Sequence, residues 1–380
     1  MRPPATCGEG AGRADGEDVR GVTAALRTVT TMAACHLPVL ALSLLAVAGD
    51  LDWREGPPMP VALGNHAAAV VDGQVLVAGG TTWRDGRKLW LSDVWASDLK
   101  AGNWRRLGDL PEPVGGAATI AAGNALYVIG GSDGVGGSCR CWRLRLEDGG
   151  LSVRRLPDLP EPRVYAAGAR VGRYLCVVGG CTDTAALDTA ARTLFALNLM
   201  QPDQGWQELA RIPGPARVIH AAAGDLRSLY VFGGCHLDDA GKVRNLADAW
   251  CYQMDRSRWA RLPDLPAACR GLTALGLGHR GVLLIGGYTA TVEEAEGQAP
   301  DFGFSADVLR YDPGGEVYRE LGRLPRATAC VAAVRVGGEV AVLGGEPAMR
   351  QRADRVWLTD RALLLRTGVV PPDTSPMLRF

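Results

Sequence analysis

The stretch QVLVAGG at residues 74–80 ends an apolar strand in a pair of glycines, and the chain repeats this arrangement five more times. The other copies read ALYVIGG (125–131), YLCVVGG (174–180), SLYVFGG (228–234), GVLLIGG (281–287) and EVAVLGG (339–345). Successive pairs lie 49 to 58 residues apart. A strand that recurs with a period near fifty predicts one supersecondary unit repeated around a ring or along an array.

Each repeat contains four apolar or aromatic segments. In AAAVVDGQVLVAGG (67–80), two strands flank Asp72-Gly73, a dipeptide typical of a two-residue hairpin. A third strand follows each glycine pair after a polar loop, as in SDVWASDL (92–99). A fourth carries an aromatic residue and runs into a proline, as in WQELARIP (206–213). Six units of four antiparallel strands predict an all-β fold, a six-bladed β-propeller.

The position of Trp53 predicts how the ring closes. Trp53 precedes Gly80 by 27 residues, and 27 or 28 residues separate every other fourth-strand position from the glycine pair that follows it. Gly345, in contrast, has no aromatic fourth strand behind it. We therefore expect residues 53–58 to complete the blade formed by 326–361, so that the N- and C-terminal segments pair. The alternative is that ALLLRTGVV (362–370) completes that blade.

The segment before the repeats has the features of a signal peptide. An apolar run from Leu37 to Ala48 follows Arg20 and Arg27, is too short to span a bilayer, and ends in the small-x-small sequence Ala-Val-Ala. The alternative is an ordinary tail with a chance apolar run. We expect export to the periplasm or the medium, and three parts: a leader (1–48), a propeller (49–361) and a C-terminal tail (362–380).

Composition limits the classes of partner and of metal site. The formal net charge is zero and 22% of the residues are charged, which gives no attraction for nucleic acid or an anionic membrane. Ten cysteines include Cys7 and Cys35 in the leader. The remaining eight permit disulfides, with Cys139–Cys141 and Cys176–Cys181 the nearest pairs, and we expect core thiols at Cys176, Cys251 and Cys330. The absence of any C-x-x-C pair argues against a zinc ribbon.

The order of strand, Gly-Gly, loop, aromatic strand and Trp-x-x-Leu resembles the kelch repeat over residues 51–361. A narrower resemblance lies in GGEPAMRQRADRVW (344–357), which is similar to the Gly-Glu-x5-Arg-x-Asp-x-Val element of the bacterial N-acetylneuraminate epimerases, the sialic acid mutarotases. QGWQELARIPGPARVIHAAAG (204–224) with SLYVFGG is similar to another blade of that family. The Glu-Arg blade comes last here instead of in the middle, so the chain resembles a cyclically permuted member, a shift that a closed ring tolerates.

The resemblance implies an isomerase, a mutarotase that interconverts the anomers of a carboxylated sugar, most simply N-acetylneuraminate. Glu346 would be the catalytic acid or base, and Arg352 would hold the substrate carboxylate or, by its proximity, favour the ionised form of Glu346. Arg350 could compete for the role of Arg352. No cofactor is expected, because breaking and remaking a hemiketal needs only proton transfer and positioning.

In a meandering blade, the segment before the first strand and the loop after the second strand meet at one mouth of the central channel. Residues of this mouth that could bind an acidic sugar are Asn65, His66, Arg163, Arg217, Arg270 and Arg326. Arginine suits a carboxylate because it offers two parallel, charge-assisted hydrogen bonds. Each arginine could instead have a structural role, bonding the neighbouring blade.

Three histidines lie at or near the same mouth. His66, His220 and His236 lack Cys, Asp or Glu at ligand spacing, so no metal is expected. The expected partner is a small acidic sugar, with no nucleic acid, no membrane after leader removal, and a monomer or weak dimer. The alternative function is a non-catalytic kelch propeller that binds a protein or a glycan through its loops.

Overall fold

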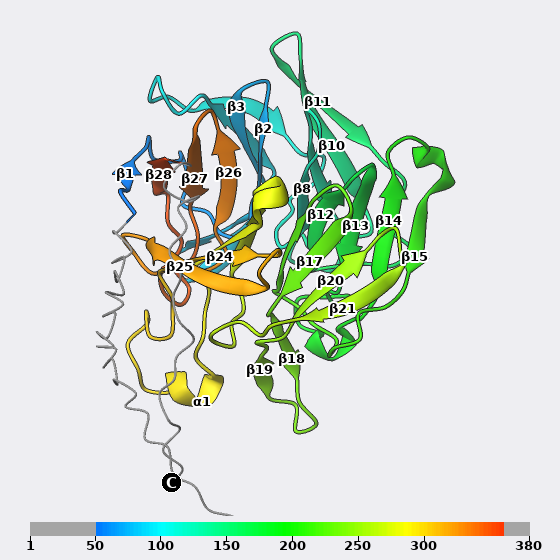
Figure 1. Cartoon of the computed structure of the whole chain (residues 1–380). Coiled ribbons are helices and arrows are strands. Elements are labelled where there is room, and N and C mark those ends of the chain that lie inside the picture. The colour runs from blue at the N-terminus through cyan, green and yellow to red at the C-terminus, as the bar shows by residue number, and fades with distance from the viewer. Residues whose placement is uncertain (1–50, 361–380) are drawn as a thin grey trace, which may run out of the picture. The chain divides into compact units, whose positions relative to one another are not determined.

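The computed structural model describes residues 51–360, and these form six four-stranded antiparallel sheets (Figure 1). Each sheet is one blade. Blade 1 consists of β2 (Ala67–Val71), β3 (Gln74–Ala78), β6 (Asp93–Ser97) and β7 (Arg105–Asp109). Blade 2 consists of β8 (Ala118–Ala121), β9 (Leu126–Ile129), β10 (Cys141–Glu147) and β11 (Gly150–Arg155). Blade 3 consists of β12 (Ala167–Val171), β13 (Tyr174–Val178), β14 (Leu194–Asn198) and β15 (Trp206–Leu209).

Blades 4 to 6 follow the same order from the inner strand to the outer strand. Blade 4 consists of β16 (Ala221–Gly224), β17 (Ser228–Phe232), β20 (Ala249–Gln253) and β21 (Arg258–Leu262). Blade 5 consists of β22 (Thr273–Gly276), β23 (Val282–Ile285), β24 (Asp307–Asp312) and β25 (Val317–Arg323). Blade 6 consists of β26 (Ala332–Val336), β27 (Glu339–Leu343), β28 (Val356–Asp360) and β1 (Arg54–Glu55). The four strands predicted for each repeat are confirmed.

The six inner strands form a closed ring. In the order β2, β8, β12, β16, β22 and β26, each contacts the next, and β26 contacts β2. The glycine pairs join neighbouring blades, because the second glycine of each pair donates its N–H to a carbonyl just before the next inner strand, at 2.7 to 2.9 Å. The last of these bonds runs from Gly345 to Leu63 and crosses between the two ends of the chain. The predicted six-bladed propeller is confirmed.

Blade 6 is completed by the segment after Trp53, as predicted. In β1, Arg54 pairs with Leu358, and the Gly56 N–H donates to the Val356 carbonyl at 2.8 Å. Figure 1 shows β1 beside β28 although they come from opposite ends of the described chain. Trp53 Nε1 also donates to the Arg323 carbonyl of blade 5, as Trp104 Nε1 does to the Pro57 carbonyl. The alternative closing segment, 362–370, lies outside the described residues, as do the predicted leader (1–48) and tail (362–380).

The core is divided among the six interfaces between blades. Each hydrophobic cluster combines residues of two adjacent blades: Val77 and Leu358 belong to the cluster between blades 1 and 6, and Val128 and Ala78 to the one between blades 1 and 2. The second strand of each blade, which runs into the glycine pair, is buried along nearly its whole length. A strand covered on both faces needs apolar side chains at consecutive positions, which explains runs such as VLVA.

Insertions after some glycine pairs add to the face where those pairs lie. They comprise the hairpin of β4 (Thr81–Arg84) and β5 (Arg87–Trp90), the hairpin of β18 (Cys235–Leu237) and β19 (Val243–Asn245), and α1 (Val292–Ala295). Three single-turn 3₁₀ helices cover Leu187–Thr189, Pro202–Gln204 and Gly278–Arg280. Among residues 51–360, none of the helices has the length and apolar character needed to cross a membrane.

The eight cysteines of the described chain are all free, so neither disulfide permitted by the sequence is formed. Cys176 and Cys251 lie buried on strands, as predicted for core thiols. Cys330 does not, because it precedes β26, is only partly buried and lines the central channel. Cys7 and Cys35 lie outside the described residues.

Candidate functional site

A ring of six backbone hydrogen bonds surrounds one mouth of the central channel. The residue two positions before each inner strand donates its N–H to the carbonyl of the equivalent residue in the preceding blade, at 2.7 to 3.3 Å. We call these residues the mouth ring: Asn65, Gly116, Tyr165, Ile219, Gly271 and Cys330. Every bond joins two blades, so the ring fixes the positions of the loops around the opening.

All six residues of the mouth ring have left-handed backbone conformations, with φ between 54° and 67°. Glycine adopts this region without strain, but Ile219 at φ 54° is β-branched and strongly disfavoured there. Non-glycine residues in this conformation persist only where the surrounding structure holds them, and such strain is concentrated at functional sites. The closed hydrogen-bond ring supplies that restraint.

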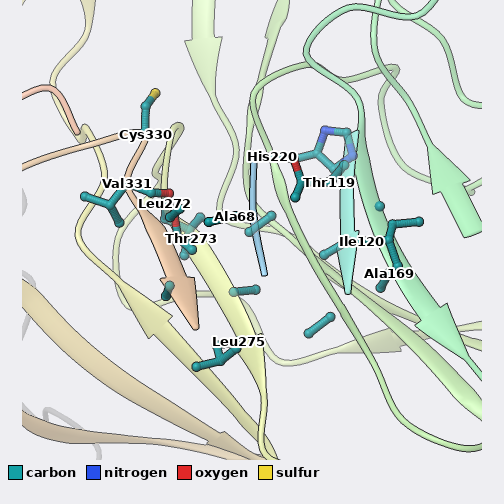
Figure 2. A pocket seen from close by; sticks show the side chains of 18 of the residues that line it. Ala68, Thr119, Ile120, Ala169, His220, Leu272, Thr273, Leu275, Cys330 and Val331 are labelled. Atoms are coloured by element: carbon teal, nitrogen blue, oxygen red, sulfur yellow. Dashed lines mark hydrogen bonds between the residues drawn. The ribbon is translucent and has the colours of Figure 1, made fainter. Parts of the chain in front are cut away.

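The channel behind the ring is a cavity of about 330 Å³ walled by the six inner strands. Figure 2 shows Cys330 and His220 near one end of this wall and Leu275 near the other. Many of the lining side chains are alanine, glycine or threonine, which leaves the lumen open. A concave site of this size suits a small molecule such as a sugar.

Glu346 lies directly beside the mouth ring. It is the first residue after the sixth glycine pair, and its backbone forms a two-bond bridge with Ala329, the neighbour of Cys330. The equivalent positions of the other blades hold Thr81, Ser132, Cys181, Cys235 and Tyr288. Among the six equivalent positions, all within residues 51–360, Glu346 is therefore the single carboxylate.

Arg352 contacts Glu346 and at the same time reaches into blade 1. Its Nη1 lies 2.8 Å from Glu346 Oε1, with the two side chains 4% and 20% exposed, and its Nε and Nη2 both lie 3.3 Å from Thr81 Oγ1. The guanidinium passes over Gly64, where a Cβ would lie 2.7 Å from Arg352 Cδ. A glycine is thus required at position 64 for this arginine to hold its place.

Arg350, the competing arginine, has different surroundings. It is exposed, has a φ of 59°, and lies over the Trp83 ring with its guanidinium carbon 5.9 Å from the ring centroid. The structure therefore brings Arg352, and not Arg350, into contact with Glu346.

Two of the predicted substrate-binding arginines lie within the blades instead of facing the channel. Arg217 is fully buried and makes a bidentate pair with Asp248, at 2.9 and 2.6 Å. Burial alone would raise the pKa of Asp248, but the hydrogen bonds and charge of Arg217 outweigh it and the pKa is lowered. Arg163 is also buried, and it bonds Thr193 and Glu161. Their geometry fits the structural role that the sequence left open.

The other predicted binding residues lie around the mouth, at different depths. Asn65 belongs to the mouth ring, and Arg270 is next to Gly271 of the ring. The Arg270 guanidinium stacks on Tyr288 at 4.4 Å and its Nη1 donates to Asn245 Oδ1 at 2.5 Å. Arg326 is exposed and lies four residues before Cys330 of the mouth ring.

His66 and His220 line the channel just inside the mouth ring. Both imidazoles are buried and neither nitrogen of either ring has a hydrogen-bond partner among the described residues. Burial lowers the pKa of His66 to about 4, with a further contribution from the Arg352 charge, and burial with the Arg217 charge lowers that of His220 to about 3. Both are therefore neutral at neutral pH. No cluster of three potential metal ligands occurs among residues 51–360.

Lys88, on the hairpin beside this mouth, was not predicted from the sequence. Lys88 lies on β5, in the hairpin that begins at Thr81, and its side chain is partly buried. Its pKa is lowered, first by burial and then by the Arg352 charge, while Glu346 acts in the opposite direction. The residues Asp85 and Gly86, with φ values of 51° and 73°, form the two-residue turn, so a hairpin could have been predicted from Asp-Gly.

Comparison with known proteins agrees with the fold. A family model described as N-acetylneuraminate epimerase matches residues 156–296, and a kelch-motif model matches residues 62–111. Glu346 and Arg352 lie outside both matched segments.

Curated relatives include three N-acetylneuraminate epimerases. The protein from Haemophilus influenzae (strain PittEE) is 28% identical over 185 residues, covering 42% of this chain and 49% of the relative. That from Yersinia enterocolitica is 29% identical over 198 residues (45% and 50%), and that from Pasteurella multocida (strain Pm70) is 30% identical over 183 residues (42% and 48%). The match thus spans about half the length of these relatives. The comparisons confirm the resemblance predicted from the sequence: parts of this six-bladed propeller are similar to the N-acetylneuraminate epimerases and to the kelch motif.

Proposed function

We propose that this protein is a mutarotase that accelerates the interconversion of the anomers of a carboxylated sugar, with N-acetylneuraminate as the first candidate substrate. The observation that carries the proposal is the contact between Glu346 and Arg352 beside the mouth ring of an open channel. The similarity of residues 156–296 to N-acetylneuraminate epimerases supports the class of substrate.

Mutarotation requires a group that moves protons, and we assign this role to the Glu346 carboxylate. Glu346 takes the proton of the anomeric hydroxyl while the bond between the anomeric carbon and the ring oxygen breaks, and it then delivers this proton to the ring oxygen. The resulting open-chain ketone rotates and closes again on its other face by the reverse steps. Bonds and protons balance without an oxidant or a reductant.

Arg352 is the partner that prepares Glu346 for this role. It lies nearest to Oε1, which leaves Oε2 as the oxygen available to the sugar. This contact holds the Glu346 carboxyl group in one position beside the channel mouth. Because Arg352 is also bonded to Thr81, the orientation of Glu346 depends on the junction of blades 6 and 1.

The proposed binding set is narrower than the one predicted from the sequence. Asn65 and Arg270 lie at the mouth, and His66 forms part of the channel wall below them. Arg163 and Arg217 are assigned to the stability of the blades, because their guanidinium groups are buried and bonded there.

A second candidate function is binding of a protein or glycan by the loops, without catalysis. The observation in its favour is that Val292, Phe302 and Met349 have exposed apolar side chains. The segments that carry Phe302 and Met349 are joined by a hydrogen bond from the Met349 N–H to the Pro300 carbonyl. Exchange NMR on the two anomers of N-acetylneuraminate separates the candidates, because a binding protein leaves the exchange rate at its spontaneous value.

Export is part of the proposal and is tested separately. Cell fractionation followed by N-terminal sequencing would find the mature protein outside the cytoplasm with a new N-terminus near residue 49. Recovery of the intact chain from the cytoplasm would contradict it.

A further inference from the structure

The arginines closest to Glu346 have little capacity left for a second anion. Arg352 is engaged by Glu346, by Thr81 Oγ1 and, through Nη1, by the Gln351 carbonyl at 2.8 Å. Arg270 donates to Asn245 and to the Ala290 carbonyl and lies on the Tyr288 ring. A substrate carboxylate therefore needs another cation at this mouth.

Lys88 is held at the mouth by Trp90. Its Nζ lies 4.9 Å from the centroid of the Trp90 ring, and a cation over an indole face is attracted by the ring. Trp90 pairs with Thr81 and packs against blade 2, where a Cβ on Gly115 would lie 3.2 Å from its ring. Because Gly115 precedes Gly116 of the mouth ring, this packing anchors the lysine beside the opening.

The hairpin that carries Lys88 begins at Thr81, whose Oγ1 contacts Arg352 of the proposed catalytic pair. Burial and then the Arg352 charge lower the pKa of Lys88, and the Glu346 charge acts in the opposite direction. Lys88 forms no ion pair with any residue between 51 and 360, and a partly buried ammonium without a counter-ion is costly. An anion at the mouth would remove that cost.

We propose that Lys88 binds the carboxylate of the acidic sugar while Glu346 acts on the anomeric hydroxyl of the same molecule. The assignment rests on the proposed function, because it needs a substrate in which both groups are borne by one carbon. Lys88 would offset the repulsion between Glu346 and the incoming carboxylate. Arg352 offsets this repulsion less well, because it is already paired with Glu346. It would also make the site selective for acidic sugars over neutral ones.

The test measures equilibrium binding of N-acetylneuraminate and of its uncharged methyl ester by ligand-observed proton NMR at pH 7. Lys88→Met is expected to weaken binding of the acid by roughly 10- to 100-fold, the range for one hydrogen bond to a charged group, and to leave binding of the ester unchanged. Arg87→Met is the matched control, since Arg87 is an exposed cation next to Lys88 in the same hairpin, and it should behave like wild type.

Lys88→Arg and Lys88→Gln complete the design and cover the case in which Lys88→Met does not fold. Because the pKa of Lys88 is lowered, wild-type affinity for the acid should fall as the pH rises through that pKa, whereas Lys88→Arg should keep its affinity. The neighbours do not interfere, since burial raises the pKa of Cys330 and of Tyr165 to about 12.

The outcomes separate the two claims. If wild type binds and equilibrates the acid, but Lys88→Gln or Lys88→Met binds it as well as wild type does, the assignment of Lys88 is wrong and the proposed function stands. If wild type neither binds the acid nor equilibrates its anomers, the proposed function is wrong and the assignment of Lys88 falls with it.

Discussion

Arg352 Nη1 lies 2.8 Å from Glu346 Oε1, and the same guanidinium donates to Thr81 Oγ1 of the first blade. Glu346 and Arg352 come from the last blade of the ring and Thr81 from the first, so the contact depends on ring closure.

Arg352→Lys is expected to lose activity by at least about tenfold, because an ammonium cannot contact Glu346 and Thr81 at once as the planar guanidinium does. The measurement is the rate of anomer exchange at saturating substrate. Arg350→Lys is the matched control and should retain the wild-type rate. Equal losses in the two variants would contradict the assignment of Arg352.

Gly64→Ala is expected to reduce activity by roughly 10- to 100-fold, because its Cβ would lie 2.7 Å from Arg352 Cδ and Nε and would displace the guanidinium. Gly338→Ala meets no atom within 4 Å and serves as the control. Thermal unfolding should change little in either variant. Full activity of Gly64→Ala would show that the position of Arg352 is not critical.

Trp53→Val is expected to lower the free energy of unfolding by about 2–4 kcal/mol, through the loss of buried aromatic surface and of the bond to the Arg323 carbonyl. Trp104→Val should cost a similar amount, because Trp104 makes the equivalent bond to Pro57. Urea denaturation measures both. A negligible effect at Trp53 alone would mean that β1 does not contribute to blade 6 in solution.

The stability of the fold is expected to fall between pH 6.5 and about pH 4.5 because of His66 and His220. In the unfolded chain both histidines become protonated near pH 6.5. In the folded chain, burial lowers the pKa of His66 to about 4 and that of His220 to about 3, so both stay neutral until the pH is lower. As the pH falls through this window, each histidine therefore lowers the free energy of unfolding by about 1.4 kcal/mol per pH unit. Urea denaturation should show a smaller loss for His220→Gln than for wild type. An identical pH dependence in the two proteins would contradict the buried, neutral state of His220.

Most of the fold could be predicted because the repeat is local in sequence. The glycine pairs mark the end of each second strand, and Asp72-Gly73 marks a hairpin. Trp53 could be assigned to blade 6 because the distance from each fourth strand to the next pair is nearly constant. These features depend on a few neighbouring residues, and geometry forces them to recur in every blade.

The site was predicted less completely because its parts come together only in three dimensions. The mouth ring has no common side-chain chemistry, since it contains Asn65, Tyr165, Ile219 and Cys330 besides two glycines, and its hydrogen bonds join backbones. Arg217 could not be excluded from the site by sequence, because its partner Asp248 lies 31 residues away. Lys88 was missed because only the packing of Trp90 directs it toward the mouth.

The most direct test of the account is proton NMR of freshly prepared α-N-acetylneuraminate, followed with no protein and with equal amounts of wild type, Glu346→Gln and Glu320→Gln. Glu320 is an exposed glutamate on the outer strand β25 and serves as the control. The account predicts faster equilibration by wild type and Glu320→Gln, and a loss of roughly 100- to 10,000-fold in Glu346→Gln. Equilibration at the spontaneous rate with wild type, or at the wild-type rate with Glu346→Gln, would contradict it.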